Sequence, residues 1–149
     1  MSSIPKGAVC LIACCSAKAP HAAPVRHFYT SDLFRKSLAF ADRNGFKWAV
    51  LSAKHGLILP DQVIEPYDLS IAQLTAMNGK AHYHQWGAQI ADALGHFETR
   101  DFVFLAGQRY RDAITSSQIW RARLYQAHIP MEGLGIGQQK AWLANAIAA

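Results

Sequence analysis

The sequence has little that would tie it to a membrane, a disulfide framework or a metal. Only 17% of its 149 residues are charged, and no apolar run approaches the roughly 20 residues of a membrane span. The amino terminus lacks the apolar core of a secretory signal, and Cys10, Cys14 and Cys15 lie too close together for a framework. No CxxC or HExxH pattern occurs, and the spacing of His82 and His84 does not suit one helix face. We therefore expect a cytoplasmic protein with reduced thiols and with no metal or cofactor.

What the sequence does contain is typical of one globular domain, residues 1–149. Hydrophobic residues make up 51% of the chain, and a domain of this length buries roughly two thirds of its unfolded surface. Fifteen Lys and Arg against ten Asp and Glu give a net charge of +5. This excess suits a polyanionic partner such as nucleic acid. The basic residues are scattered, so folding must assemble any phosphate-binding face.

The apolar pattern alternates between strand-like and helix-like segments. Buried strands are predicted at residues 8–13, 48–51, 102–105 and 124–129. Helices are predicted at residues 31–44, 70–77, 80–94, 108–115 and 136–147. Apolar strands in a βαβ order imply a parallel sheet that helices cover on both faces. We therefore predict an α/β, three-layer sandwich around a central, mainly parallel four-stranded sheet.

Three of these strands are followed by chemically unusual residues. The first is followed by CCSAK (14–18), the second by SAKHG (52–56) and the third by GQRY (107–110). In open parallel sheets, ligands bind beyond the carboxyl ends of the strands. The three loops are therefore expected to share one edge of the sheet and to enclose one site. The chain continues from the second loop to EPYD (65–68), which adds two carboxylates and a tyrosine.

Several of these motifs together resemble the YaaA superfamily. They are CCSAK (14–18), YTSDLF (29–34), LSAKHGLILP (51–60), EPYD (65–68) and GLGIGQQ (133–139). This grouping includes YaaA peroxide-stress DNA-binding proteins, small bacterial and phage proteins, and a domain of archaeosine synthase. The resemblance implies a layout similar to the uracil-DNA-glycosylase fold, with the site at the strand ends. The chain has no GQDPYH-type or HPSPLS-type motif, so standard uracil excision is not implied.

The residue types at the strand ends suit cleavage of a glycosidic bond. The transition state resembles an oxocarbenium ion, so a carboxylate must stabilise positive charge or orient water. Asp68 or Glu65 can supply this carboxylate. The departing base needs a donor, and His55 can provide one near neutral pH. Asp68, His55 and Glu65 are therefore the predicted catalytic residues.

A base must also leave the stack, which requires an aromatic platform and cations for the flanking phosphates. Tyr29 and Tyr67 are predicted platforms, and Lys18 and Lys54 are predicted phosphate or base contacts. The rest of the predicted binding set consists of Ser16, Ser52, Gly107 and Gln138.

Three functions fit these residues. The first is a DNA glycosylase that removes a bulky or hypermodified base, which would suit defence against phages. The second is a non-catalytic DNA-binding stress protein of the YaaA type. The third is modification of a nucleotide or a tRNA base, with Lys18 positioning the substrate. The glycosylase is favoured because a Lys-His-Asp-Tyr cluster exceeds what phosphate binding requires. DNA is the more expected nucleic acid, and the protein is expected to be a monomer.

Each assignment has a structural alternative. His55 can be a turn residue, and Lys54 can pair with Glu65. Asp68 can cap the helix that follows it, and Tyr67 can be a core residue with a bonded hydroxyl.

Two further motifs remain open in the same way. Cys15 can be a nucleophile or a structural thiol. The glycines of the GLGIGQQ motif are interpreted as a tight entry to the last helix.

Overall fold

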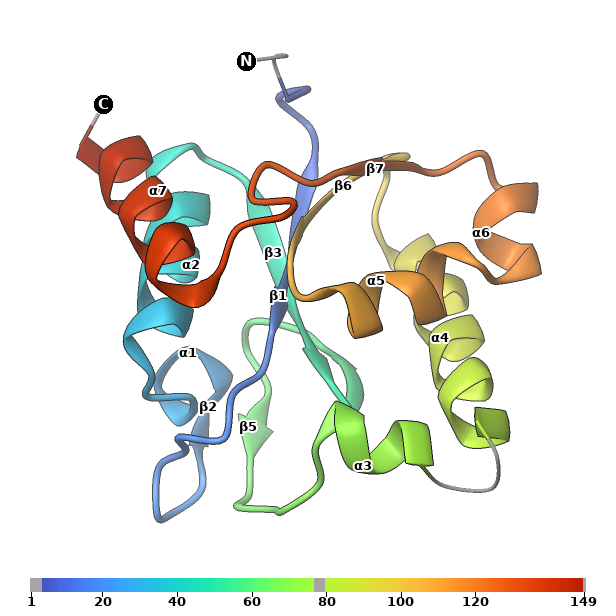
Figure 1. Cartoon of the computed structure of the whole chain (residues 1–149), viewed down its shortest axis with the longest axis horizontal. Coiled ribbons are helices and arrows are strands. Elements are labelled where there is room, and N and C mark those ends of the chain that lie inside the picture. Colours follow the sequence, from blue (N-terminus) through green and yellow to red (C-terminus); the bar gives the residue numbers. More distant parts are fainter. Residues whose placement is uncertain (1–3, 77–79, 149) are drawn as a thin grey trace.

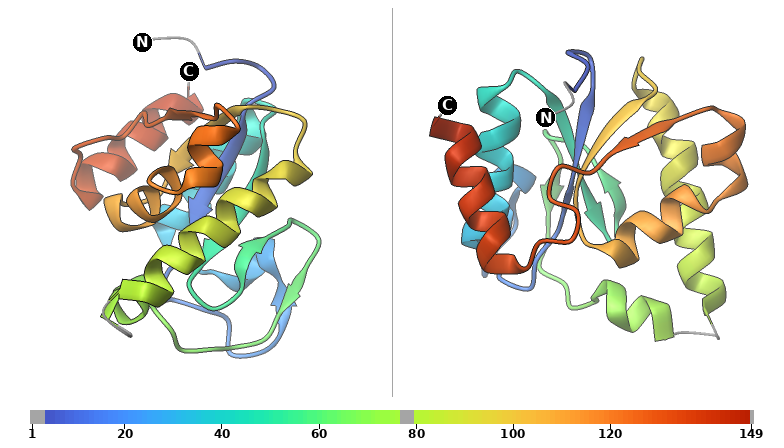
Figure 2. Two further views of the ribbon diagram at one scale, coloured as in Figure 1. Left: turned by 90° about the vertical axis from the view of Figure 1, so that its right-hand side faces the viewer. Right: turned by 45° about the horizontal axis from the view of Figure 1, so that its top comes forward.

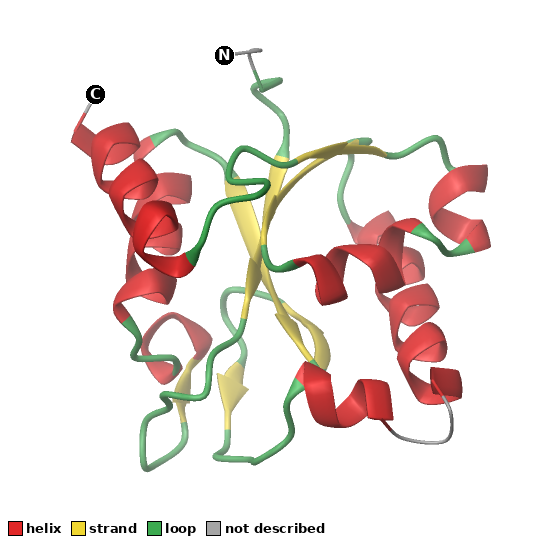
Figure 3. Cartoon of the chain, viewed as in Figure 1, coloured by secondary structure: helices red, strands yellow, loops and turns green. Residues whose placement is uncertain are grey.

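A five-stranded sheet forms the centre of the protein (Figure 1; Figure 3). The computed structural model describes residues 4–76 and 80–148. In spatial order the strands are β4 (Gly56–Ile58), β3 (Lys47–Ser52), β1 (Val9–Ala13), β6 (Asp101–Leu105) and β7 (Gln126–His128). The last four of these run parallel to one another, and β4 is antiparallel to β3.

The α/β class is confirmed, but the sheet is mixed and has one strand more than predicted. The extra strand, β4, begins at Gly56, which has a left-handed φ of +71°. The chain can therefore turn back beside β3 within a few residues. The sequence pattern suggested a loop here, because β4 is only three residues long.

Strand β1 lies in the middle of the parallel set. Cys10 pairs with Trp48 of β3 on one side and with Val103 of β6 on the other. The chain passes from β1 to β3 and later crosses back to β6 on the opposite side of β1. The space beyond the carboxyl ends of β1 and β6 is thus a topological switch point, where ligand sites of α/β sheets form.

The helices agree with the predicted ones within a few residues, and the structure adds short elements that the pattern missed. The helices are α1 (Val25–Phe28), α2 (Asp32–Arg43), α3 (Ile71–Ala76), α4 (Ala81–Ala93), α5 (Gln108–Thr115), α6 (Gln118–Ala122) and α7 (Ile136–Ala148). A 3-10 turn (Leu94–His96) continues α4, and β2 (Ala23–Pro24) pairs with β5 (Val63–Ile64). The missed elements are α1, α6, β2 and β5. The predicted stop of the helix at Asn78 and Gly79 lies outside the described residues.

Helix α2 begins and ends where its sequence signals indicate. The Ser31 hydroxyl accepts a hydrogen bond of 3.1 Å from the Phe34 N–H, which satisfies one open donor of the first turn. The helix ends at Asn44, and Gly45 follows with a φ of +69°.

The sheet lies between two helical layers (Figure 1; Figure 2). Helices α2 and α7 cover one face, and α4, α5 and α6 cover the other. Successive residues of β1 alternate between the two cores: Cys10 and Ile12 face the α2 side, and Val9 and Leu11 face the α4 side. Both faces are therefore buried, as the apolar strands predict.

Close packing of α4 against α5 helps to position the carboxyl end of β3. A Cβ at Gly87 would lie 1.9 Å from the carbonyl oxygen of Ala113, so only glycine permits this approach. The neighbouring Trp86 is buried, and its indole Nε1–H donates a hydrogen bond of 2.8 Å to the carbonyl of Ser52.

Within residues 4–76 and 80–148, none of the helices has both the length and the apolar character needed to cross a membrane. In the same residues, no three His, Cys, Asp or Glu side chains gather in a position to hold a metal ion. The three thiols are not joined to one another, and burial raises the pKa of the Cys10 thiol to about 12.

Candidate functional site

The carboxyl ends of β1, β3 and β6 lie at one edge of the sheet, the lower edge in Figure 1. Side chains from two of the loops that leave this edge meet around Tyr67, and a third loop joins them through Tyr110. We call this group the Tyr67 rim; its members are Cys14, Lys18, Ser52, Lys54, His55, Tyr67 and Tyr110.

The ring of Tyr67 is the centre of the rim. Phe28 stacks against it with nearly parallel planes, 9° apart, at 6.2 Å between centroids. The ammonium groups of Lys18 and Lys54 lie 4.7 Å and 5.9 Å from the ring centroid. The imidazole of His55 contacts the ring at a right angle, 4.9 Å between centroids. Two cations and an imidazole therefore converge on one half-buried aromatic side chain.

Hydrogen bonds hold the Tyr67 hydroxyl in place. It bonds to the Ser52 hydroxyl at 2.9 Å and to the hydroxyl of Tyr29. The Ser52 oxygen also accepts the main-chain N–H of His55 at 3.1 Å, which fixes the start of the turn after β3. Ser52 and Tyr29 are buried, at 0% and 1% exposure. The ring of Tyr67 is thus anchored at its hydroxyl end before any ligand arrives.

The first and third loops are joined by Cys14 and Tyr110. The Cys14 sulfur lies 3.5 Å from the Tyr110 hydroxyl, at hydrogen-bonding distance for sulfur. Lys18 is held by an antiparallel bridge to Tyr29. The β1 and β3 loops therefore lie together at this edge, as the sequence predicts, and the β6 loop contacts them through Tyr110.

Burial sets the ionisation of the tyrosines and the histidine. Loss of water raises the pKa of Tyr67 to about 12 and raises the pKa values of Tyr29 and Tyr110 as well. All three phenols are therefore neutral at pH 7. The pKa of His55 is lowered from 6.5, first by desolvation and second by the charge of Lys54. His55 is mostly neutral at pH 7 and can donate a hydrogen bond as an imidazole.

The structure places the two predicted catalytic carboxylates at the border of the rim. Asp68 and Glu65 flank the Pro66–Tyr67 pair and are exposed. Among the described residues, neither takes part in a hydrogen bond or an ion pair with the rim, and Lys54 does not pair with Glu65. The proposed helix-capping role of Asp68 is wrong, because a different residue caps α3.

That cap is Ser70. The Ser70 hydroxyl accepts the Gln73 N–H at 3.0 Å, and the Gln73 side-chain oxygen accepts the Ser70 N–H at 2.8 Å. This is a reciprocal capping box. Asp68 therefore remains available to solvent.

Other predicted residues have structural roles or lie apart. Tyr29 and Ser52 are buried, so they anchor Tyr67 and do not present a surface to a ligand. Gln138 accepts the Gly135 N–H at 3.1 Å and so begins α7, in agreement with the tight-entry interpretation. Ser16 and Gly107 are exposed, and Gly107 is the N-cap of α5. The Cys15 thiol donates to the Ala17 carbonyl at 3.1 Å.

Two residues that contact the predicted set were not chosen from the sequence. Phe28 stacks on Tyr67, and Trp86 bonds to Ser52 from the other helical layer. A buried tryptophan on a helix requires a partner for its N–H, and this is the only sequence signal that pointed to such a contact.

Comparison with known proteins identifies a family and one partial relative. The model of a family of unknown function, DUF6884, matches residues 9–145. A UPF0246 protein of Acaryochloris marina is 38% identical over 73 residues. The matched segment is 47% of this chain and 29% of that protein, so the chain corresponds to a minor part of the relative. UPF0246 proteins belong to the YaaA family, so this partial match gives a loose link to that family and says nothing of a uracil-DNA-glycosylase layout.

Proposed function

The chain belongs to the DUF6884 family, and we propose that its Tyr67 rim binds DNA and hydrolyses the glycosidic bond of a modified base. The observation that carries the proposal is the convergence of Lys18, Lys54 and His55 on the ring of Tyr67. An aromatic face flanked by cations is what a protein needs to hold a base that has left the duplex.

Binding would begin with the phosphates. In the free protein, Lys18 and Lys54 lie against the ring of Tyr67, where a base would stack. Exposed cation–π contacts contribute only about 0.5–1 kcal/mol, so a phosphate can draw the ammonium groups off the ring. The ring is then free to receive the base. The net charge of +5 favours approach of a polyanion.

In the hydrolytic step, water adds to C1′ of the sugar as the C1′–N bond breaks and its electron pair leaves with the base. The proton of the attacking water passes to the carboxylate of Asp68 and then to solvent. The same negative charge stabilises the oxocarbenium-like transition state. Asp68 is preferred to Glu65 because it is adjacent to Tyr67 in the chain.

The lowered pKa of His55 changes the role expected of it. A neutral imidazole is a poor acid, so His55 would stabilise the departing base as an anion by donating a hydrogen bond. Lys54, whose charge adds to desolvation in lowering the pKa of His55, would place positive charge beside the same anion. The base takes its proton from solvent after it leaves.

A non-catalytic DNA-binding function is the second candidate. One observation favours it: among the described residues, the exposed carboxylates of Asp68 and Glu65 form no hydrogen bond or ion pair with His55 or Tyr67. Under this alternative the rim holds DNA through the two lysines and Tyr67, and no base is released.

The deciding experiment offers the purified protein DNA from several phages, unmodified and hypermodified, and measures both DNA binding and alkali-labile breaks. Release of a base from hypermodified DNA supports the glycosylase. DNA binding without breaks leaves the non-catalytic function, and absence of binding excludes both.

Variants then test the assigned residues. Asp68→Asn should lower base release at least about a hundredfold, which corresponds to about 2.7 kcal/mol, and should leave binding intact. Because Ser70 caps α3, this variant should keep the wild-type melting temperature. Glu132→Gln, an exposed acid that is not a member of the rim, is the matched control. If Asp68→Asn turns over like the wild type, Glu65→Gln tests the other carboxylate.

A further inference from the structure

The outer edge of β3 is longer than the strand that covers it. Strand β4 pairs with residues 50–52 only, so the first half of β3 has no neighbour on that side. In the same register Pro60 would stand opposite Trp48, but proline has no N–H to donate. The chain turns away instead: the Gln62 N–H donates to the Leu59 carbonyl at 3.1 Å, and the Gln62 side chain accepts the Leu59 N–H at 2.7 Å.

The side to which each main-chain N–H and C=O group of β3 points shows which of them β4 leaves without a hydrogen-bond partner. The Leu51 carbonyl accepts the Cys14 N–H at 3.0 Å, so the main-chain groups of Leu51 face β1. Successive residues of a strand direct these groups to opposite sides. Those of Trp48, Val50 and Ser52 therefore face the outer edge. Strand β4 pairs with Val50 and Ser52, whereas the N–H and C=O of Trp48 face no strand.

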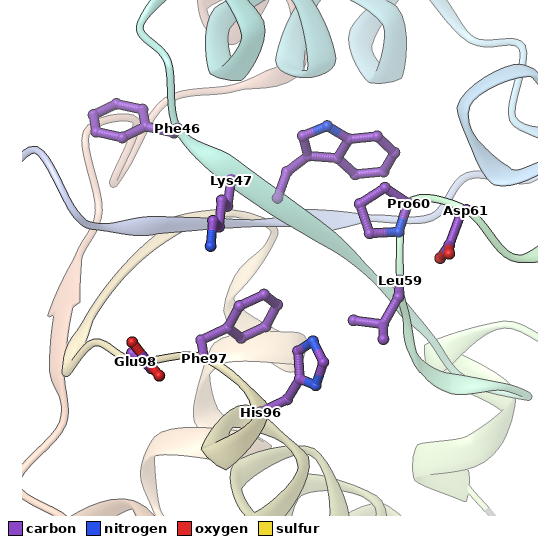
Figure 4. A pocket seen from close by; sticks show the side chains of 9 residues that line it. Phe46, Lys47, Leu59, Pro60, Asp61, His96, Phe97 and Glu98 are labelled. Atoms are coloured by element: carbon purple, nitrogen blue, oxygen red, sulfur yellow. The ribbon is translucent and has the colours of Figure 1, made fainter.

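These open groups border a hollow of about 670 Å³ at this edge of the sheet (Figure 4). We call it the Phe97 hollow. Its main lining residues are Phe46, Lys47, Leu59, Asp61, Phe97 and Glu98. Trp48 borders it through the main chain, because its indole is buried in the core on the α2 side.

The lining combines an apolar floor with charges that lack internal partners. Phe97 and Leu59 are half-buried and pack against the core on the α4 side. Lys47, Asp61 and Glu98 point around this floor (Figure 4), and in residues 4–76 and 80–148 none of them belongs to an ion pair. Together these three side chains carry a net charge of −1, whereas the whole chain carries +5.

We propose that the Phe97 hollow binds an extended peptide segment, which adds to the sheet as an antiparallel strand beside the open edge of β3. A peptide residue opposite Trp48 would accept its N–H and donate to its C=O, as in other cases of strand addition. The residues before and after it would direct their side chains to the floor, because alternate side chains of a strand share one face.

The lining specifies these two side chains. An apolar one fits against Phe97 and Leu59, and a basic one two positions away complements Glu98, which lies at the opposite end of the hollow from Asp61 (Figure 4). The hollow lies at the amino-terminal half of β3, whereas the Tyr67 rim lies beyond its carboxyl end. The inference therefore does not depend on the proposed function.

The test uses capped pentapeptides that carry Phe at the second position and Lys at the fourth. With the peptide bound, hydrogen exchange of the Trp48 amide should slow by about fivefold or more, as expected for one new hydrogen bond. The same peptides methylated on the nitrogen of the third residue keep every side chain but cannot donate to the Trp48 carbonyl. They should bind at least about fivefold more weakly.

Two variants locate the charge contact. Glu98→Gln should weaken the peptide by about two- to fivefold, the range of an exposed ion pair, and the control Glu132→Gln should not. Equal binding of methylated and unmethylated peptides, or an unchanged Trp48 amide at the highest soluble peptide concentration, would overturn the proposal. A third result would also overturn the proposal: without peptide, hydrogen exchange of the Trp48 amide becomes slower as the protein concentration rises. A second copy of the protein would then cover the edge of β3.

Discussion

The Tyr67 rim and the Phe97 hollow lie toward opposite ends of β3 and differ in how their polar groups are satisfied. At the rim, hydroxyl groups from Ser52, Tyr29 and Tyr67 bond to one another, and both lysines rest on an aromatic ring. At the hollow, three charged side chains and the main chain of Trp48 lack partners within the described residues.

This difference separates two ways to prepare a binding surface. The rim is organised before a ligand arrives, which reduces the ordering that binding requires. The hollow leaves donors and acceptors to water, so a partner must supply the missing hydrogen bonds. Mutations at the rim should therefore affect stability and function together, whereas those at the hollow should affect mainly binding.

The largest difference should appear in stability. Tyr67→Ala removes a ring that packs on Phe28 and a hydrogen-bond partner of the buried Tyr29 hydroxyl. We expect it to lower the free energy of unfolding by about 3 kcal/mol. Phe97→Ala, at the hollow, should cost only about 1–2 kcal/mol, because its side chain is half-buried and no polar group loses a partner. Urea unfolding monitored by circular dichroism measures both.

Tyr67→Phe separates the contribution of the Tyr67 ring to stability from that of its hydroxyl. It keeps the ring and removes the hydroxyl, so it should cost about 1–2 kcal/mol. If Tyr67→Ala is no more destabilising than Phe97→Ala, the rim is not preorganised and the comparison fails.

An intermediate effect is expected on DNA binding. Lys18→Ala and Lys54→Ala should each reduce the slope of log K against log salt by about 0.9, if each lysine neutralises one phosphate. Lys47→Ala, at the hollow, should leave the slope unchanged. Fluorescence anisotropy between about 50 and 200 mM salt measures these slopes. A slope that responds to Lys47 but not to Lys18 or Lys54 would move the DNA surface away from the rim.

The smallest effect concerns the ionisation of His55. Its pKa should lie below 6.5 in the free protein and rise toward that value in Lys54→Gln, because the substitution removes a neighbouring positive charge. Lys36→Gln, on α2, is the control. NMR titration of the imidazole measures the shift, and an unchanged pKa in Lys54→Gln would show that desolvation alone is the cause.

The direction of this shift also predicts a pH dependence of stability. A pKa that is lower in the folded state means that the unfolded chain binds the proton more readily. Stability should therefore fall as the pH drops through 6.5 and level off below the folded-state pKa of His55. Above pH 6.5 this histidine should contribute no pH dependence.

Much of the fold could be predicted from local patterns. The strands at the centre of the sheet are runs such as Val9–Ala13 with both faces buried, and the bounds of α2 follow from Ser31, Asn44 and Gly45. The missed elements are short. Strand β4 has three residues and depends on the turn at Gly56, and β2 and β5 have two residues each. Segments of this length are too short to show a recognisable repeat of apolar residues.

The spatial grouping of the candidate side chains was predicted in part. Lys18, Lys54, His55 and Tyr67 come together as expected, because parallel strands deliver their loops to the same edge. The roles of Tyr29 and Ser52 could not be foreseen, because the sequence does not show that they are buried behind Tyr67.

The sequence by itself determined the chain order of the longer strands and helices, the buried faces and the sheet edge at which the three loops meet, because strand polarity and apolar periodicity are local properties. Only the tertiary structure decided which side chains meet there. Cys14 and Tyr110 are 96 positions apart, and their contact depends on how α5 packs after β6. The open main chain of Trp48 likewise exists only because the chain turns away from β3 after Ile58, the last residue of β4, and no feature of Trp48 itself encodes it.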